Sequence, residues 1–127
     1  MFQNIFHQDD PVIETIGQDF FANLGDDVSL PCRVPNLGSW MRVWKQGSRA
    51  ITVDKLLIRL DQRLSLSDAG DLQIRNFDSE DVGEYDCEIA DTDTPLYIRH
   101  SLNIIVPPAV NIVPSKDEIV VVEVRMI

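Results

Sequence analysis

Two cysteines and the alternating side chains around them limit the folds open to this chain more than any other feature. Tyr85, Cys87 and Ile89 fall on one apolar face of a predicted strand, with acidic residues between them, because successive side chains of a strand point to opposite sides. Segment 28–34 places Cys32 on a similar apolar face. We therefore predict that the two strands pack across a β-sandwich with a Cys32–Cys87 disulfide, which would stabilise it by roughly 4 kcal/mol through chain entropy.

Trp44 and Tyr85 narrow the fold prediction to one type of sandwich. Trp44 lies on the next predicted strand, where it would pack against the disulfide, and Tyr85 stands two residues before the second cysteine. Both positions are typical of immunoglobulin domains, whose tyrosine hydroxyl bonds back to the backbone. Leu72 and Ile74 alternate inward on a further strand. The pattern predicts an all-β, immunoglobulin-like β-sandwich of the V/I type, with two antiparallel sheets and one inter-sheet disulfide.

The predicted strands divide the chain into three parts. We expect residues 1–11 to form a flexible N-terminal tail, 12–108 the immunoglobulin domain, and 109–127 a linker and the truncated start of a second immunoglobulin-like domain. Gly17 interrupts the first strand, 12–22, and predicts a kink at which it switches sheets. The β-rich end of the chain could pair with the first domain, pair with another copy or stay exposed. The other predicted strands are 28–34, 40–46, 50–53, 56–58, 63–66, 71–75, 83–90 and 96–106.

Arg42 departs from the alternation. It lies two residues before Trp44, on the side expected to face the core. Either a bulge shifts the register of this strand, or Arg42 buries its stem and reaches the end of the sandwich. We favour the second interpretation.

Composition excludes several classes of function. The formal net charge of −10 and the absence of a Lys/Arg run argue against binding to nucleic acid, whose phosphates would be repelled. Paired cysteines favour an extracellular or cell-surface protein. The first seven residues do not have the pattern of a signal peptide, and no apolar run is long enough to span a membrane. We expect signal peptide and anchor to be absent from this chain.

No motif of an enzyme or a metal site is found in the sequence. His7 lies in the predicted tail, and His100 lies inside a strand without a nearby nucleophile motif, so we interpret His100 as a packed or edge residue. The Asp-rich stretches lack the spacing of an EF-hand and are interpreted as solvated loops. We expect no enzymatic activity, no cofactor and no metal.

A family resemblance follows from the residues together. Cys32, Trp44, Arg63, the segment 81–87 and the closing Ile105-Val106-Pro107-Pro108 resemble the first immunoglobulin domain of neural cell-adhesion proteins. The nearest likeness is to the arthropod lachesin, amalgam and klingon type, related to the IgLON and Dpr/DIP groups. The resemblance implies a salt bridge between Arg63 and Asp81. It also implies that the domain binds another such domain through the sheet formed by 96–106, 83–90, 40–46, 50–53 and 56–58, here called the GFCC′C″ face.

Side-chain alternation then assigns the residues that point outward on this face. They combine an apolar centre with a polar rim, as partner interfaces do. The alternative is a purely structural role, in which residues 56–58 only cover the sandwich edge. We predict a cell-surface or secreted recognition or adhesion module that binds itself or a related immunoglobulin domain, with a homodimer as the expected assembly. The alternative is a soluble immune or ligand-binding module that reads its target with loops 36–39 and 92–95. The predicted partner-binding residues are Met41, Val43, Lys45, Ile51, Val53, Leu56, Ile58, Glu88, Tyr97 and Arg99.

Overall fold

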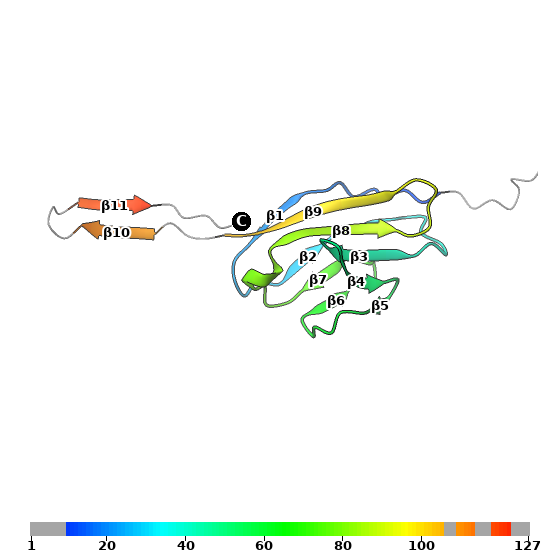
Figure 1. Cartoon of the computed structure of the whole chain (residues 1–127), viewed down its shortest axis with the longest axis horizontal. Helices are drawn as coiled ribbons and strands as arrows, with labels where there is room; N and C mark the ends of the chain where they lie inside the picture. Colours follow the sequence, from blue (N-terminus) through cyan, green and yellow to red (C-terminus); the bar gives the residue numbers. More distant parts are fainter. Residues whose placement is uncertain (1–9, 106–108, 114–117, 123–127) are drawn as a thin grey trace, which may run out of the picture.

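The computed structural model describes residues 10–105 and the backbone of two further strands, 109–113 and 118–122. The regular secondary structure of the described chain is almost entirely β (Figure 1). Its strands are β1 (Asp19–Ala22), β2 (Val28–Leu30), β3 (Arg42–Gln46), β4 (Arg49–Val53), β5 (Leu56–Leu57), β6 (Leu64–Leu66), β7 (Leu72–Ile74), β8 (Gly83–Ile89), β9 (Leu96–Ile104), β10 (Ala109–Val113) and β11 (Glu118–Val122), and a single 3₁₀ turn, η2 (Ser79–Asp81), precedes β8.

Two sheets enclose the core. The larger sheet has the order β1-β9-β8-β3-β4-β5, and the smaller sheet has the order β2-β7-β6. Strand β1 runs parallel to β9, and the other pairs are antiparallel. Leu30, Leu72 and Ile74 of the smaller sheet are fully buried, as are Trp44 and Leu102 of the larger sheet. The predicted two-layer β-sandwich is confirmed.

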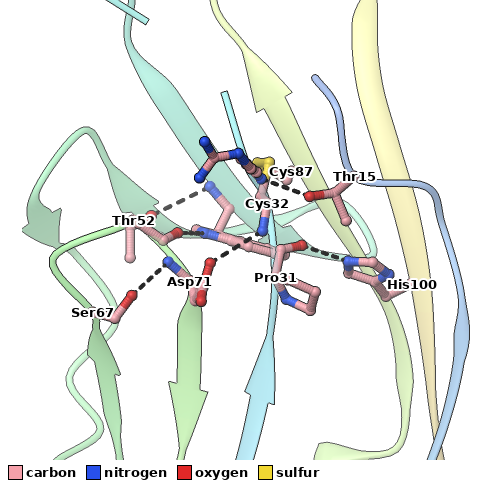
Figure 2. Close-up of a disulfide and its surroundings, with 11 residues drawn as sticks. Thr15, Pro31, Cys32, Thr52, Ser67, Asp71, Cys87 and His100 are labelled. Carbon is pink, nitrogen blue, oxygen red and sulfur yellow. Dashed lines mark hydrogen bonds between the residues drawn. A yellow bond between two sulfur atoms is a disulfide. The ribbon is translucent and has the colours of Figure 1, made fainter. Parts of the chain in front are cut away.

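The Cys32–Cys87 disulfide joins the sheets and is also confirmed. Both cysteines are fully buried, with their Cα atoms 6.5 Å apart. The Cys32 backbone N–H donates to Asp71 Oδ1 at 3.3 Å, and the Asp71 N–H donates to Ser67 Oγ at 3.0 Å (Figure 2). The disulfide is thus tied by hydrogen bonds to the turn between β6 and β7.

The first predicted strand is divided at Gly17, as expected. Glu14 N–H donates to Arg33 O, which follows the smaller sheet, whereas β1 pairs with β9 of the larger sheet. A Cβ atom on Gly17 would lie 2.3 Å from the Arg99 carbonyl oxygen, so only glycine permits this close approach.

The buried His100 ring links the segment before β1 to the end of β2, near the point where the first strand changes sheets. It is fully buried, and its Nδ1 accepts from Gln18 N–H at 3.1 Å while its Nε2 lies 2.7 Å from Pro31 O (Figure 2). The backbone donor at Nδ1 requires Nε2 to carry the hydrogen and to donate to Pro31 O. The ring also stacks on Trp44, with centroids 6.3 Å apart. Both ring nitrogens therefore hold the fold together.

A bulge in β4 corrects one expectation. Trp44 pairs with Thr52 and Lys45 with Ala50, so Ile51 is an extra residue on β4. Because the extra residue interrupts the alternation, Ile51 and Thr52 both become fully buried. The prediction that Ile51 points outward beside Val53 is wrong.

The end of the sandwich nearest η2 is closed by an ion pair. Arg63 Nη1 and Nη2 donate to the carboxylate of Asp81 at 2.7 and 2.9 Å, which is the pair that the resemblance implies. Tyr85 donates its hydroxyl hydrogen to Asp81 O at 2.5 Å, and burial raises the pKa of Tyr85. Arg63 also bonds Asp61, and these carboxylates raise its pKa, Asp81 most.

Strands β10 and β11 pair with each other in an antiparallel two-stranded sheet, from Ala109 opposite Val122 to Val113 opposite Glu118. Self-pairing was not among the arrangements considered from sequence. The predictions for residues 1–9, Val106, Pro107 and Pro108, 114–117 and 123–127 lie outside the described residues.

Candidate partner-binding face

The outer surface of the larger sheet carries the residues predicted to bind a partner. Strand register places five of them in one row across the sheet. Tyr97 pairs with Glu88, Glu88 with Val43, Val43 with Val53, and Val53 with Leu56. Paired residues point to the same side of a sheet. The GFCC′C″ face therefore has a continuous row of side chains running from β9 to β5.

The half of this face formed by β3, β4 and β5 is apolar. Leu56 is 66% exposed, Ile58 44% and Met41 39%, and Val43 and Val53 are half-buried between them. Val43, Val53 and Leu56 come from adjacent strands, and Met41 and Ile58 lie directly beside β3 and β5, so together they form one surface rather than scattered single residues. Apolar surface grouped in this way is typical of protein interaction sites.

The half formed by β8 and β9 is charged and internally paired. Arg99 donates from Nε to Asp86 Oδ1 at 2.8 Å and from Nη2 to Asp86 Oδ2 at 3.0 Å. These hydrogen bonds raise the pKa of Arg99 above its usual value. Its guanidinium lies 5.6 Å from the centre of the Tyr97 ring, a distance compatible with a cation–π contact.

Lys45 joins the two halves. Its ammonium lies 2.8 Å from Glu88 Oε2, and each side chain is 33% exposed. Exposed charge pairs of this kind contribute little to the stability of the fold. At the border between apolar and charged surface, such a pair is instead suited to steering and orienting a partner.

The bulge removes Ile51 from the face and puts Ala50 there instead, opposite Lys45. Simple alternation could not reveal this exchange, since it assumes one residue of β4 for each residue of β3. Leu60, two residues after Ile58, is fully exposed and was not selected from sequence.

The loops of the alternative hypothesis lie together at one end of the sandwich. A shallow pocket of about 300 Å³ lies beside them, lined by Ser39 of the first loop and by the flanking residues Trp40, Met41, Ala90 and Asp91. Asn36 accepts from Val12 N–H and donates to Asp10 O. Thr92 Oγ1 donates to Thr94 O at 2.6 Å. The first loop is therefore tied to the segment before β1, and the second by a hydrogen bond within itself.

Two negative findings apply to the part of the chain that the structure describes. No three His, Cys, Asp or Glu side chains gather there in an arrangement that could hold a metal ion. No helix in that part is long and apolar enough to cross a membrane.

Comparison with known proteins supports the immunoglobulin fold. No protein-family model and no curated protein sequence matches the chain. Among solved structures, the complex of Dpr2 Ig1-Ig2 with DIP-Theta Ig1-Ig3 is similar with a TM-score of 0.72 and 25% identity, over 85% of this chain and 38% of that one. DIP-gamma IG1+IG2 is similar with a TM-score of 0.70 and 23% identity, over 80% of this chain and 52% of that one.

The chain thus spans about two fifths and about half of these two structures, respectively. Sidekick-1 immunoglobulin domains 1-5 are similar with a TM-score of 0.63 and 18% identity, over 79% of this chain and 20% of that one. The sandwich, its disulfide and these likenesses define the fold class: the described domain is an immunoglobulin-like β-sandwich, a fold it shares with immunoglobulin domains of Dpr, DIP, Sidekick-1 and titin. The disulfide is typical of proteins outside the cell or on its surface.

Proposed function

We propose that this chain is a cell-surface or secreted recognition module that binds a second immunoglobulin domain, its own or a related one, through the GFCC′C″ face. Residues 12–108 would form the binding domain, and residues 109–127 would open a second domain. The observation that carries the proposal is the row from Tyr97 to Leu56, because it combines an exposed apolar end with a charged end on one surface.

A face divided into an apolar and a charged half suits a self-complementary interface. In a dimer related by a two-fold axis, the same patch is buried on both subunits. The apolar anchors at the β5 end of the row, Leu56, Ile58, Val43 and Met41, would then supply most of the affinity. Arg99 and Glu88 are already paired within the sheet, so they need not be left unpaired when the partner covers them.

The structural neighbours support binding between immunoglobulin domains. One neighbour is Dpr2 in complex with DIP-Theta, and two others are Dpr1 bound to DIP-eta and Dpr11 bound to DIP-gamma. By analogy we extend this kind of partner to the present chain. A role in neural recognition is part of the same proposal and rests on that analogy.

Self-binding can be tested with beads coated with the full chain. The proposal expects the beads to aggregate, and expects Leu56→Asp or Ile58→Asp to abolish the aggregation, since a charge among the apolar anchors would be buried without a partner. Leu24→Asp is the matched control, because Leu24 lies in the turn after β1 and is 60% exposed, against 66% for Leu56.

Aggregation retained by both face variants would refute the proposed face. If substitutions in loops 36–39 and 92–95 abolished binding instead, the chain would act through its loops, as in the alternative hypothesis.

A further inference from the structure

Arg42 is a buried cation inside the sandwich and away from the GFCC′C″ face. It lies on the inward side of β3, two residues before Trp44, and is only 9% exposed. The pairing of β3 with β8 is regular from Arg42 opposite Ile89 to Gln46 opposite Tyr85. Strand β3 itself therefore has no bulge toward β8, and the interpretation that Arg42 buries its stem and reaches the sandwich end fits the structure.

The guanidinium of Arg42 has no protein partner within residues 10–105. No carboxylate there forms an ion pair with it, in contrast to Arg63, and its Nε is buried without an acceptor. Burial lowers the pKa of Arg42, although the charges of Asp71 and Asp54 act in the opposite direction. Buried charges are normally paired because removing them from water is unfavourable. An arginine kept here without a partner calls for an explanation beyond stability.

Arg42 lines a pocket of about 610 Å³ at the end of the sandwich opposite η2. The pocket lies between the segment that follows β2, the β4–β5 turn and the β6–β7 turn, and its volume is in the range of small-ligand sites. Its walls are apolar at Val34, Leu37, Leu57 and Leu66. Lys55, Asp54 and Asp68 also line it, and all three are exposed. Arg42 is thus the charged group of this pocket that water reaches least.

Gly70 leaves room for the guanidinium in this position. A Cβ atom on Gly70 would lie 1.7 Å from Arg42 Nη1, and Gly70 has a φ of +89°. Trp44 Nε1 donates to Gly70 O at 2.9 Å, which ties the β6–β7 turn to the core. The close approach of turn and arginine is therefore fixed by the same tryptophan that packs beside the disulfide.

We propose that this pocket binds a carboxylate, with Arg42 as the recognition residue and the leucine-rich wall covering the carbon chain that carries the acid. Arginine suits this ligand because its guanidinium matches the planar pair of carboxylate oxygens. Asp54 and Asp68 at the pocket lining favour a single carboxylate over a polyanion. The acid can come from a small molecule or from an Asp or Glu side chain on a protein loop.

The test is an NMR titration of the full ¹⁵N-labelled chain with N-acetylglutamate methylamide and with acetate. We expect saturable shifts of the Gly70 and Asp54 amide signals, and no such shifts with the neutral N-acetylglutamine methylamide. Equal binding of both acids would point to a free acid as ligand, and tighter binding of the peptide-like acid would point to a protein loop.

Arg42→Met is the decisive variant, and Arg49→Met, at the exposed start of β4, is its control. The first should lose the titration and raise the urea midpoint, because an unpaired buried charge is removed. The second should titrate like the original chain, and Arg42→Lys should bind more weakly without losing all binding. Equal shifts with the glutamine compound, no shifts at all, or shifts that persist in Arg42→Met would overturn the proposal.

Discussion

The two faces of the larger sheet are built by neighbouring residues of the same strands, yet they differ in almost every property. On the inner face, Trp44, Tyr85 and Cys87 are at most 1% exposed. On the outer face, Leu56 and Ile58 are as apolar but about half exposed or more. These inner side chains are covered by the protein itself, while the outer apolar side chains have no cover within the described residues. This difference separates residues that hold the fold from residues available to a partner.

A charge placed on each face of β4 should separate them most sharply. Ile51→Asp puts a carboxylate into a fully buried site, and we expect a loss of more than about 4 kcal/mol in the free energy of unfolding, enough to unfold the domain. Val53→Asp, two residues along on the outer side, should lose about 1 kcal/mol. Urea denaturation measures both. Similar losses in the two variants would contradict the bulge that turns Ile51 inward.

The disulfide should have the next largest effect. Replacing Cys32 and Cys87 together by Ala opens a loop that spans 55 residues, and the chain-entropy model predicts a loss of about 4 kcal/mol. The measurement is chemical denaturation of the double variant beside the unreduced chain. A loss below about 1 kcal/mol would show that packing around Trp44 holds the sheets together without the covalent link.

Arg63 tests the end of the sandwich. Arg63→Met leaves the carboxylate of Asp81, whose side chain is 10% exposed, without its cation. Removing one partner of a partly buried pair should lower the free energy of unfolding by about 2–3 kcal/mol. Arg33→Met is the control, because Arg33 pairs with Glu14 at an exposed site where side chains are 72% and 54% exposed. Equal losses of stability in the two variants would mean that the burial of the Arg63–Asp81 pair adds nothing to its contribution.

Acid should weaken the same end of the fold by a smaller amount. Hydrogen bonds from Arg63 lower the pKa of Asp61 below its ordinary 3.8. The stability contributed by this group is therefore full above pH 3.8 and is lost as pH falls through the lower, folded-state pKa. Urea midpoints measured along a pH series should fall less steeply at acid pH in Arg63→Met than in the original chain. Parallel curves would contradict the role of Arg63.

The smallest effect on stability is expected on the outer face. Leu56→Asp should change the free energy of unfolding by no more than about 0.5 kcal/mol, because Leu56 is already largely in water. Thermal and urea unfolding check this, with Leu24→Asp as the matched exposed site. A large loss in the free energy of unfolding would mean that Leu56 covers the sandwich edge and has a structural role.

Sequence reasoning succeeded where local chemistry determines position. The spacing of Cys32, Trp44 and Cys87 predicted the sandwich, because alternation and covalent bonding leave few arrangements. It failed at Ile51, because a bulge depends on how β4 pairs with β3 and has no signal in alternation. The pocket beside Arg42 was also invisible, since its walls come from turns distant in sequence, including Gly70. On the outer face, strand pairing supplied the continuous row that single strands could not show.

Sedimentation velocity over a concentration series tests the central claim most directly, using the full chain, a version that ends at Val113, and Leu56→Asp. The account predicts a concentration-dependent dimer in the full chain and in the shorter version, and a dimer weakened at least about tenfold by Leu56→Asp. An unchanged dimer in Leu56→Asp, or a dimer lost only when residues after Val113 are removed, would contradict binding through the GFCC′C″ face.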